Sequence, residues 1–323
     1  MTIDSFHQIS FVQADIEIGQ QKRGLYQASQ YFLKYFNTYR ESFHFDIDLI
    51  GQISELIPHF QFKVRSHSDF QHLPSLSYKY LSEISYLGLL KNDICLNFGG
   101  DHSISLATVN ASLKYDPNTL VLWVDAHADV NDADHSRTGN FHGMPVQYLL
   151  EPTKRHEKLD WMATSLNHNN IIYLGLRDID PYEQSYLLKN NITFFTSDII
   201  HKRGLDSILN DLSKKINQHK NIHLSFDIDS MDPHLNICTG LPVADGLSMK
   251  HLLQIAGFIQ QTKKLKSIDI VEINPELAIH ATDIDDTFDL IRAFLNKLIS
   301  PISVSLTKDK HIEDQGDFND RFF

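Results

Sequence analysis

Residues 119–124, Thr-Leu-Val-Leu-Trp-Val, form an apolar, partly β-branched run that ends in Asp125-Ala126-His127-Ala128-Asp129. A nearly continuous apolar run of this length is typical of a strand buried on both faces, as in a parallel sheet covered by helices. In open parallel sheets, ligands bind beyond the carboxyl ends of the strands. This stretch therefore predicts a parallel α/β fold and the edge of the sheet where functional residues gather.

The same pattern recurs along the chain. Further strands are predicted at residues 94–98, 170–176, 192–196, 222–226 and 267–273, with residues 9–18 as an additional candidate. Amphipathic segments predict helices at residues 103–114, 181–189, 205–218 and 249–262, and a closing helix at residues 286–299. Residues 65–77 are predicted to form a loop. Alternation of strands and helices indicates βαβ units and a parallel sheet.

The composition is that of a globular protein: 42% of the 323 residues are hydrophobic and 22% are charged. No repeat, low-complexity block or linker divides the chain. We therefore expect one α/β domain over residues 1–304. Residues 305–323 are polar and charged and are predicted to form a C-terminal tail.

The charge balance is acidic, with 41 acidic and 29 basic residues and a formal net charge of −12. Nucleic acids and anionic membranes attract basic surfaces, so neither is an expected partner. No apolar run approaches the ~18 residues of a membrane span, and the N-terminus does not resemble a secretion signal. Two cysteines, Cys95 and Cys238, suggest no disulfide framework. These features favour a cytoplasmic protein.

Polar residues follow three of the predicted strands. Asp125, His127 and Asp129 follow residues 119–124 and share one face if the extended conformation continues. Asp227-Ile228-Asp229 follows residues 222–226 in the same way, and Gly99-Gly100-Asp101-His102 follows residues 94–98. Aspartates after strands also cap helices and form turns. Three such motifs at three strand ends favour a metal site over that alternative.

Two histidines and four aspartates suit a pair of divalent cations, because a single cation would leave buried carboxylates unneutralised. Oxygen and imidazole ligands without a thiolate favour Mn²⁺, with Co²⁺ or Ni²⁺ as alternatives. Two such ions, typically ~3.5–4 Å apart, can bridge a water molecule and lower its pKa toward neutrality. The sequence therefore predicts a two-metal hydrolytic site.

Three motifs together resemble the metal motifs of the ureohydrolase family, which includes arginases and agmatinases, with arginase the closer match. The motifs are Gly99-Gly100-Asp101-His102-Ser103, Asp125-Ala126-His127-Ala128-Asp129 and Ser225-Phe226-Asp227-Ile228-Asp229-Ser230-Met231-Asp232-Pro233. The resemblance covers residues from about 90 to 298. It implies a single three-layer α/β/α domain around an eight-stranded parallel sheet.

The resemblance also implies the metal ligands. One manganese would be held by His102, Asp125, Asp129 and Asp227, and the other by His127, Asp125, Asp227 and Asp229. A hydroxide bridging the two ions would attack the guanidinium carbon of the substrate and release urea and an amine.

Catalytic roles follow from the same resemblance. Glu272 matches the glutamate that receives the cationic guanidinium group, a role suited to a carboxylate. His142 matches the histidine that gives a proton to the leaving amine. Asp129, a ligand of one metal, is counted with them as a catalytic residue.

The amino-acid end of the substrate has its own predicted residues. Asn131, Ser136, Thr138 and Asn140 suit a carboxylate as neutral donors, and Asp180 and Glu183 match the positions that bind an α-ammonium group. Arg177 and Asp178 are expected to pair with each other instead. Both halves of an amino-acid clamp are present, so L-arginine is the favoured substrate, hydrolysed to L-ornithine and urea.

Alternatives remain open. The family's Thr-Gly-Thr-Pro run reads Thr239-Gly240-Leu241-Pro242 here, so an apolar side chain replaces a hydroxyl near the guanidinium group. A second hypothesis is therefore a related ureohydrolase that acts on agmatine, another guanidino acid or a formimino amino acid. A third hypothesis is a metal-binding protein with weak catalysis. The resemblance suggests a homo-oligomer, typically a trimer, although the tail matches no trimer-forming segment.

Overall fold

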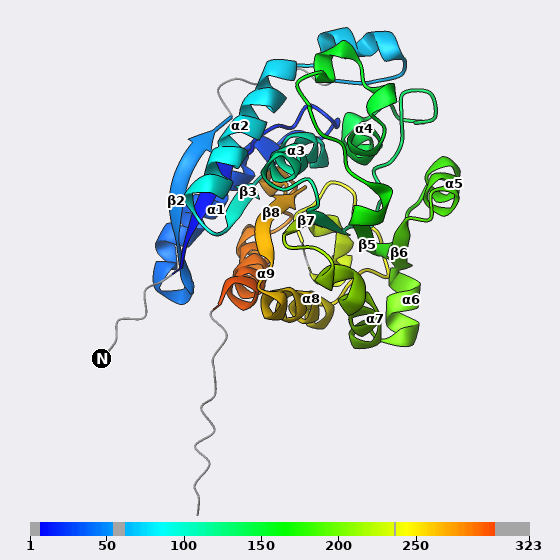
Figure 1. Cartoon of the computed structure of the whole chain (residues 1–323). Coiled ribbons are helices and arrows are strands. Elements are labelled where there is room, and N and C mark those ends of the chain that lie inside the picture. Colours follow the sequence, from blue (N-terminus) through cyan, green and yellow to red (C-terminus); the bar gives the residue numbers. More distant parts are fainter. Residues whose placement is uncertain (1–6, 54–61, 236, 301–323) are drawn as a thin grey trace, which may run out of the picture.

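A parallel sheet forms the centre of the computed structural model, which describes residues 7–53, 62–235 and 237–300 (Figure 1). Its eight strands are in the order β2-β1-β3-β8-β7-β4-β5-β6, and every neighbouring pair is parallel. The strands are β1 (His7–Gln13), β2 (Phe45–Gln52), β3 (Cys95–Phe98), β4 (Leu120–Val124), β5 (Ile171–Leu176), β6 (Thr193–Thr196), β7 (Ile222–Asp227) and β8 (Leu265–Val271). The predicted eight-stranded parallel sheet is confirmed.

Helices cover both faces of the sheet (Figure 1). One face packs against α1 (Ala28–Thr38), α6 (Ser197–Arg203), α7 (Leu205–Asn217), α8 (Met249–Thr262) and α9 (Ala281–Ile299). The other packs against α2 (Ser75–Lys91), α3 (Ser105–Tyr115), α4 (Pro145–Leu150) and α5 (Pro181–Lys189).

The central strand β4 shows why its sequence is apolar throughout. Leu120, Leu122 and Val124 face the first layer of helices, whereas Val121 and Trp123 face the second. Side chains alternate between the faces of a strand, so a strand between two helical layers needs apolar residues at every position. The three-layer α/β/α architecture follows directly.

The predicted strands between residues 94 and 273 are all present, with ends shifted by up to two residues. The strand predicted at 267–273 ends earlier, at Val271, because Glu272 adopts a left-handed conformation with φ of 64°. The predicted loop at residues 65–77 is partly wrong, since it contains a 3-10 helix (His67–His72) and the start of α2. The closing helix α9 begins at Ala281, five residues before the predicted start.

The first ninety residues contain elements that the sequence pattern did not predict. Strand β1 accounts for part of the candidate at residues 9–18, but β2, α1 and α2 were not predicted. Strand β2 lies at the edge of the sheet, where its residues are mostly half-buried and Leu49 is 53% exposed. Its aspartates interrupt the apolar run that marks the central strands. The predicted tail at residues 305–323 lies outside the described residues.

Buried polar side chains lie at the contact of α3 with strands β7 and β8. Asp269 on β8 accepts hydrogen bonds through Oδ2 from Thr108 and Ser105 of α3, at 2.6 and 3.0 Å. The same oxygen lies 3.0 Å from Nε2 of His223 on β7, and neither side chain is exposed. Burial would raise the pKa of Asp269, but His223 and the surrounding donors lower it below its usual value. The buried carboxylate of Asp269 and its hydrogen-bond partners therefore hold α3 onto the centre of the sheet.

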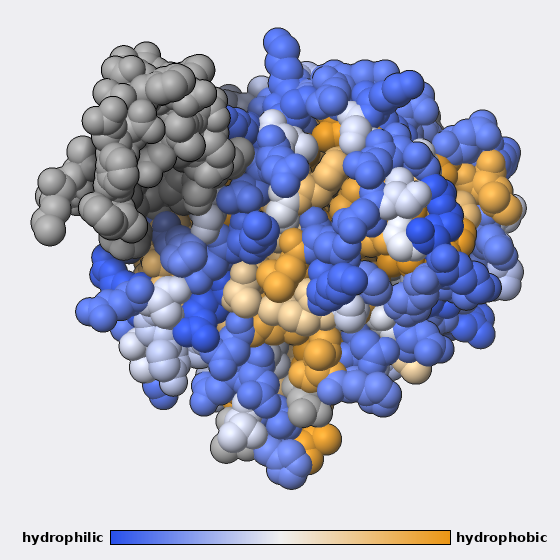
Figure 2. Space-filling view, turned by 90° about the horizontal axis from the view of Figure 1, so that it is seen from below, coloured by the Kyte–Doolittle hydropathy of each residue, from blue (hydrophilic) through white to orange (hydrophobic). Residues whose placement is uncertain are grey.

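The face seen from below is hydrophilic around its periphery, and hydrophobic side chains gather near its middle (Figure 2). Within the described ranges, no helix combines the length and the apolar character that crossing a membrane requires.

Candidate functional site

The carboxyl ends of β3, β8, β7 and β4 lie side by side, because these four strands are neighbours in a parallel sheet. The chain leaves β3 through Gly99 and Gly100, which have φ of 100° and 81°. A Cβ atom on Gly100 would lie 2.4 Å from the carbonyl oxygen of Ala14. Glycine is therefore required at this turn, which brings His102 to the end of the sheet.

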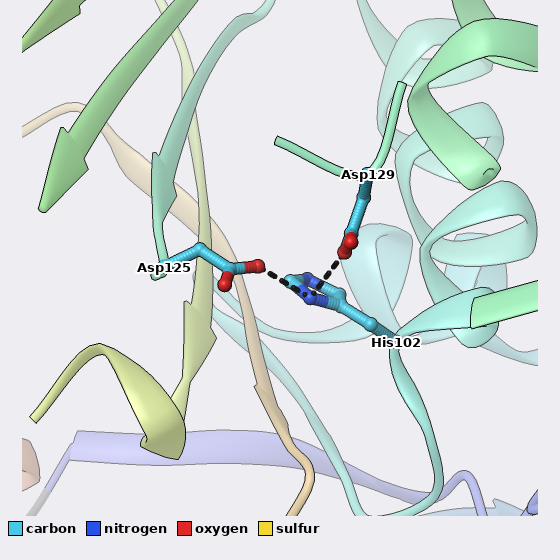
Figure 3. A group of neighbouring side chains, drawn as sticks. All are labelled: His102, Asp125 and Asp129. Carbon is cyan, nitrogen blue, oxygen red and sulfur yellow. Dashed lines mark ion pairs between the residues drawn. The ribbon is translucent and has the colours of Figure 1, made fainter. Parts of the chain in front are cut away.

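The first group of potential ligands surrounds His102. Its Nδ1 atom lies 2.9 Å from Oδ2 of Asp125, 3.0 Å from Oδ2 of Asp129 and 3.2 Å from Oδ2 of Asp227. Figure 3 shows the ring of His102 between the carboxylates of Asp125 and Asp129. All four side chains are buried. The motifs from three strand ends therefore meet as predicted from the sequence.

The chemistry of this group fits a divalent cation. Nε2 of His102 lies 2.8 Å from the hydroxyl of Ser225, and the ring stacks on Trp123 with centroids 4.1 Å apart. These contacts fix the ring with Nδ1 facing the carboxylates, yet Nδ1 has no directional hydrogen bond. Three carboxylate oxygens around one ring nitrogen exceed what a single proton can satisfy. A bound cation would satisfy all four groups at once.

Electrostatics leads to the same interpretation. Burial and the charge of Asp125 raise the pKa of Asp129 to about 6. Burial, Asp229 and Asp125 raise the pKa of Asp227 well above its usual value. Several buried carboxylates at contact distance are unfavourable without compensating positive charge. Divalent cations would supply that charge.

The second group shares Asp125 with the first. Nδ1 of His127 lies 3.1 Å from Oδ2 of Asp229 and 3.5 Å from Oδ1 of Asp125. The two carboxylate oxygens of Asp125 thus face different histidines, which is the arrangement of a bridging ligand. Asp227 is placed with His102 alone, because its Oδ1 accepts the backbone N–H of Asp229 at 2.8 Å.

The backbone reaches this arrangement by turns and not by continued extension. Strand β4 ends at Val124, Oδ1 of Asp125 accepts the backbone N–H of His127 at 2.7 Å, and Asp129 has φ of 51°. The expectation that Asp125, His127 and Asp129 share one face of an extended segment was therefore wrong. Short aspartate side chains that bond to the backbone two residues later bring them together instead.

Glu272 and His142 form a buried pair beside the first group. Oε1 of Glu272 lies 2.9 Å from Nδ1 of His142 and accepts the backbone N–H of His102 at 2.9 Å. Burial would lower the pKa of His142, but the charge and hydrogen bond of Glu272 raise it to about 9. His142 therefore carries a proton at neutral pH while it contacts Glu272.

Two residues that support this pair were not predicted. Nε2 of Gln20 donates to Oε2 of Glu272, and the carbonyl oxygen of Gly19 accepts the backbone N–H of His142 at 3.2 Å. Gly19 is itself anchored, because its N–H donates to Asp101 at 2.6 Å. These contacts join segments far apart in the chain, and no local pattern around Gln20 indicates them.

A cavity of about 510 Å³ opens above the two groups. Its lining includes most of the predicted site residues, namely His127, Asp129, Asn131, Ser136, Thr138, Asn140, His142, Asp180, Glu183, Asp227 and Asp229. His102, Asp125 and Glu272 do not line it and are almost completely buried. Lys22, Arg137 and Leu241 also line it. From the sequence, Lys22 was expected to be solvated, and Arg137 was expected to influence substrate preference as one of several extra charges of its loop.

The predicted ammonium-binding residues are held differently from one another. Glu183 is the third residue of α5, and its carboxylate accepts the backbone N–H groups of Val130 and Asp180 at 3.1 and 3.0 Å. Burial raises the pKa of Glu183 to about 8. Asp180 is more accessible, and its Oδ2 accepts a hydrogen bond from Nδ2 of Asn131 at 3.1 Å. Glu183 therefore positions the loop, whereas Asp180 faces the cavity.

Arg177 does not form the expected pair with Asp178. Its guanidinium donates to backbone carbonyl groups on two loops, including those of Asp229 at 2.6 Å and Val243 at 2.8 Å. Oδ2 of Asp178 lies 3.6 Å from Nε2 of His127. Arg177 thus fixes the loop that carries Asp229 to the wall of the cavity.

Comparison with known proteins agrees with this geometry. The model of the arginase family matches residues 7–296. The chain is 34% identical to human mitochondrial arginase-2 over 221 residues, which is 67% of this chain and 62% of that protein. It is 37% identical to bovine arginase-1 over 192 residues, 57% of this chain and 59% of that protein. It thus spans less than two thirds of the length of these curated relatives.

Among solved structures, the arginase of Entamoeba histolytica in complex with L-ornithine superposes with a TM-score of 0.79 at 28% identity. That match covers 90% of this chain and 98% of the other. Formimidoylglutamase from Bacillus subtilis has the same fold, with a TM-score of 0.72 at 19% identity over 93% of this chain and 90% of the other. The family model covers nearly the whole described chain and includes every candidate ligand, so the chain belongs to the arginase family.

Proposed function

We propose that this chain hydrolyses L-arginine to L-ornithine and urea with two bound Mn²⁺ ions. The observation that carries the proposal is the bridging position of Asp125 between His102 and His127, below a cavity of suitable size. Asp129 and Asp227 would complete one site and Asp229 the other. When bound, the two ions would lower the pKa of a water molecule and so supply a nucleophile near neutral pH.

Glu272 would receive the guanidinium group of the substrate. In the structure its carboxylate contacts the side chain of His142 and accepts a hydrogen bond from Gln20. The substrate guanidinium is also a cation, so it can replace the imidazolium at Glu272 without leaving a buried carboxylate unpaired. Gln20 and the backbone N–H of His102 would keep the carboxylate in place during this exchange.

His142 would then serve as the general acid. Its pKa of about 9 favours the protonated form at neutral pH, and it lines the cavity together with Asp129. When the bond between the guanidinium carbon and the side-chain nitrogen of the substrate breaks, that nitrogen needs a proton to leave as an amine. A histidine released from Glu272 by the substrate can donate that proton.

The far end of the cavity would hold the amino-acid part of the substrate. Oδ1 of Asn131 and Oδ1 of Asn140 are buried without a hydrogen-bond partner. Buried polar atoms of this kind are costly unless a ligand satisfies them. The hydroxyls of Ser136 and Thr138 accept backbone N–H groups, which leaves each O–H free to donate to a carboxylate.

A product assay on the purified protein loaded with Mn²⁺ tests the proposal. Urea, ammonia and formamide would be measured with L-arginine, agmatine, a guanidino acid and a formimino amino acid as substrates. We expect urea, and the highest kcat/KM for L-arginine. Preferred release of formamide, or a clear preference for agmatine, would instead support a related ureohydrolase. Metal binding without turnover of any of these compounds would favour a metal-binding protein with weak catalysis.

We further propose a cytoplasmic location and a homo-oligomeric state. Both cysteines are free and buried, as suits a reducing compartment. Cell fractionation tests the location, and a mitochondrial signal would contradict it. Light scattering coupled to gel filtration tests the oligomeric state. We expect the mass of three chains, and the mass of one chain would contradict the proposed homo-oligomer.

A further inference from the structure

An ion pair lies at the mouth of the cavity. Nη2 of Arg137 is 3.2 Å from Oδ1 of Asp180, and both residues line the cavity. The side chain of Arg137 is 83% exposed and that of Asp180 is 28% exposed. Exposed pairs of this kind contribute little to stability. Both groups can therefore exchange partners at little cost when a ligand enters.

The pair is the electrostatic complement of the α-carbon of a free amino acid. Such a substrate carries one carboxylate and one ammonium group on the same carbon, and Arg137 and Asp180 present the opposite charges side by side. A guanidinium can donate two parallel hydrogen bonds to a carboxylate. Nδ2 of Asn131 holds the second oxygen of Asp180, so the carboxylate stays in position if Arg137 turns away.

We propose that Arg137 is a specificity-determining residue that binds the α-carboxylate of the substrate through its full positive charge. On binding, the guanidinium exchanges Asp180 for the substrate carboxylate, and Asp180 becomes available to the ammonium group. The inference rests on the proposed hydrolysis of a guanidino compound and assigns the preference for a zwitterionic amino acid over an amine to the charge of one residue, Arg137.

The charge of Arg137 separates this role from those of its neighbours. Ser136 and Thr138 flank it on the same loop, and their hydroxyls, which accept backbone N–H groups, carry no net charge with which to prefer a carboxylate over another polar acceptor. A substrate without the carboxylate, such as agmatine, must place its ammonium group at Asp180 against competition from Arg137. Such a substrate breaks the Arg137–Asp180 pair and forms one new pair, between its ammonium group and Asp180. An amino acid breaks the same pair but forms two, because its carboxylate also pairs with Arg137.

A comparison of two substrates across variants tests the inference. Arg137→Gln removes the charge, and Arg137→Lys keeps the charge but not the planar fork. Arg203→Gln is the matched control, because Arg203 forms an exposed pair with Asp211 at 2.5 Å and does not line the cavity. For the Mn²⁺-loaded proteins, kcat/KM would be measured with L-arginine and with agmatine.

We expect Arg137→Gln to lower kcat/KM for L-arginine about 10-fold, mainly through KM, with no loss for agmatine. The kcat/KM of Arg137→Lys for L-arginine should lie between those of Arg137→Gln and the wild type. Arg203→Gln should have the wild-type kcat/KM for both substrates. An equal loss for both substrates would show a structural role only. An unchanged ratio of the two kcat/KM values would also overturn the inference.

A binding measurement tests the role of Arg137 without requiring that the protein hydrolyse any substrate. Calorimetry would compare L-ornithine with 1,4-diaminobutane, which lacks the carboxylate, on wild-type protein and Arg137→Gln. If no guanidino compound yields urea, the proposed hydrolysis fails, but loss of the ornithine preference in Arg137→Gln still supports the role of Arg137. If L-arginine is hydrolysed and Arg137→Gln keeps the wild-type ornithine preference, this inference alone fails. Equal binding of the two ligands to the wild type also overturns it.

Discussion

Oε1 of Glu272 lies 2.9 Å from Nδ1 of His142, and the two side chains are 4% and 12% exposed. The contact holds the imidazole beside the metal-binding groups and raises its pKa to about 9, although burial acts in the opposite direction. One carboxylate thus positions the candidate general acid and keeps it protonated until a cationic substrate arrives. The pair joins the two predicted catalytic residues into a single unit.

Glu272→Gln should impair both substrate binding and catalysis. The neutral amide removes the charge that pairs with the guanidinium group and that keeps His142 protonated. We expect kcat/KM for L-arginine to fall by at least about 100-fold, with a higher KM and a lower kcat. His142→Asn should lower kcat with a smaller change in KM. Steady-state urea assays check both variants, and an unchanged KM in Glu272→Gln would contradict the assigned role.

Asp132 joins the substrate loop to the rest of the domain. Its Oδ2 accepts hydrogen bonds from Nζ of Lys154 at 2.7 Å and from the hydroxyl of Tyr182 at 3.0 Å, and its Oδ1 lies 2.6 Å from Nδ1 of His135. Asp132→Asn weakens these bonds beside Asn131 and Ser136. We expect KM for L-arginine to rise several-fold while kcat changes little. A selective fall in kcat with normal KM would argue against this positioning role.

The same residue should make stability depend on acid pH. Burial would raise the pKa of Asp132, but Lys154 and His135 overcome this effect and lower it to about 2, against an ordinary value of 3.8. A carboxyl whose pKa is lowered by folding stabilises the native state fully above its unfolded pKa and loses this effect as pH falls toward the folded value.

Urea unfolding in the presence of a chelator checks this dependence. The difference in unfolding free energy between wild type and Asp132→Asn should be constant above pH 5 and shrink between about pH 4 and pH 2. If the difference in unfolding free energy grew as the pH fell, the lowered pKa of Asp132 in the folded state would be contradicted.

Asp269 should be the most sensitive of the buried polar side chains below α3. Removal of the Asp269 carboxylate leaves the buried hydroxyls of Thr108 and Ser105 and Nε2 of His223 without this partner, and buried unsatisfied groups cost about 1–3 kcal/mol. We therefore expect Asp269→Ala to lower the unfolding free energy by that amount. Asp211→Ala, in the exposed pair with Arg203, is the control and should change it by less than about 1 kcal/mol. Similar small changes in both variants would show that the buried contacts of Asp269 are not stabilising.

The sequence was sufficient to predict the parallel sheet and to select six side chains that the structure brings together at its edge. Both depend on local patterns, since a strand between two helical layers is apolar throughout and the ligands follow directly after three such strands. Parallel neighbours place those strand ends together, so short motifs such as Asp125 to Asp129 determine a site in space.

Contacts between distant segments could not be predicted in this way. Gln20 reaches Glu272 across 252 residues, and Arg177 reaches Val243 across 66. Edge strand β2 was missed because a half-buried strand lacks the continuous apolar run of a central one. The backbone path between Asp125 and Asp129 was also mispredicted, because aspartate turns replace an extended segment there.

Urea release from L-arginine, measured as a function of Mn²⁺ bound per chain, tests the proposed two-metal hydrolysis. We expect no urea from metal-free protein and a rate that rises until two ions are bound, with Asp125→Asn unable to bind both. Full occupancy by two ions without urea release from L-arginine would contradict the proposed function. Equal rates with and without metal would do so as well.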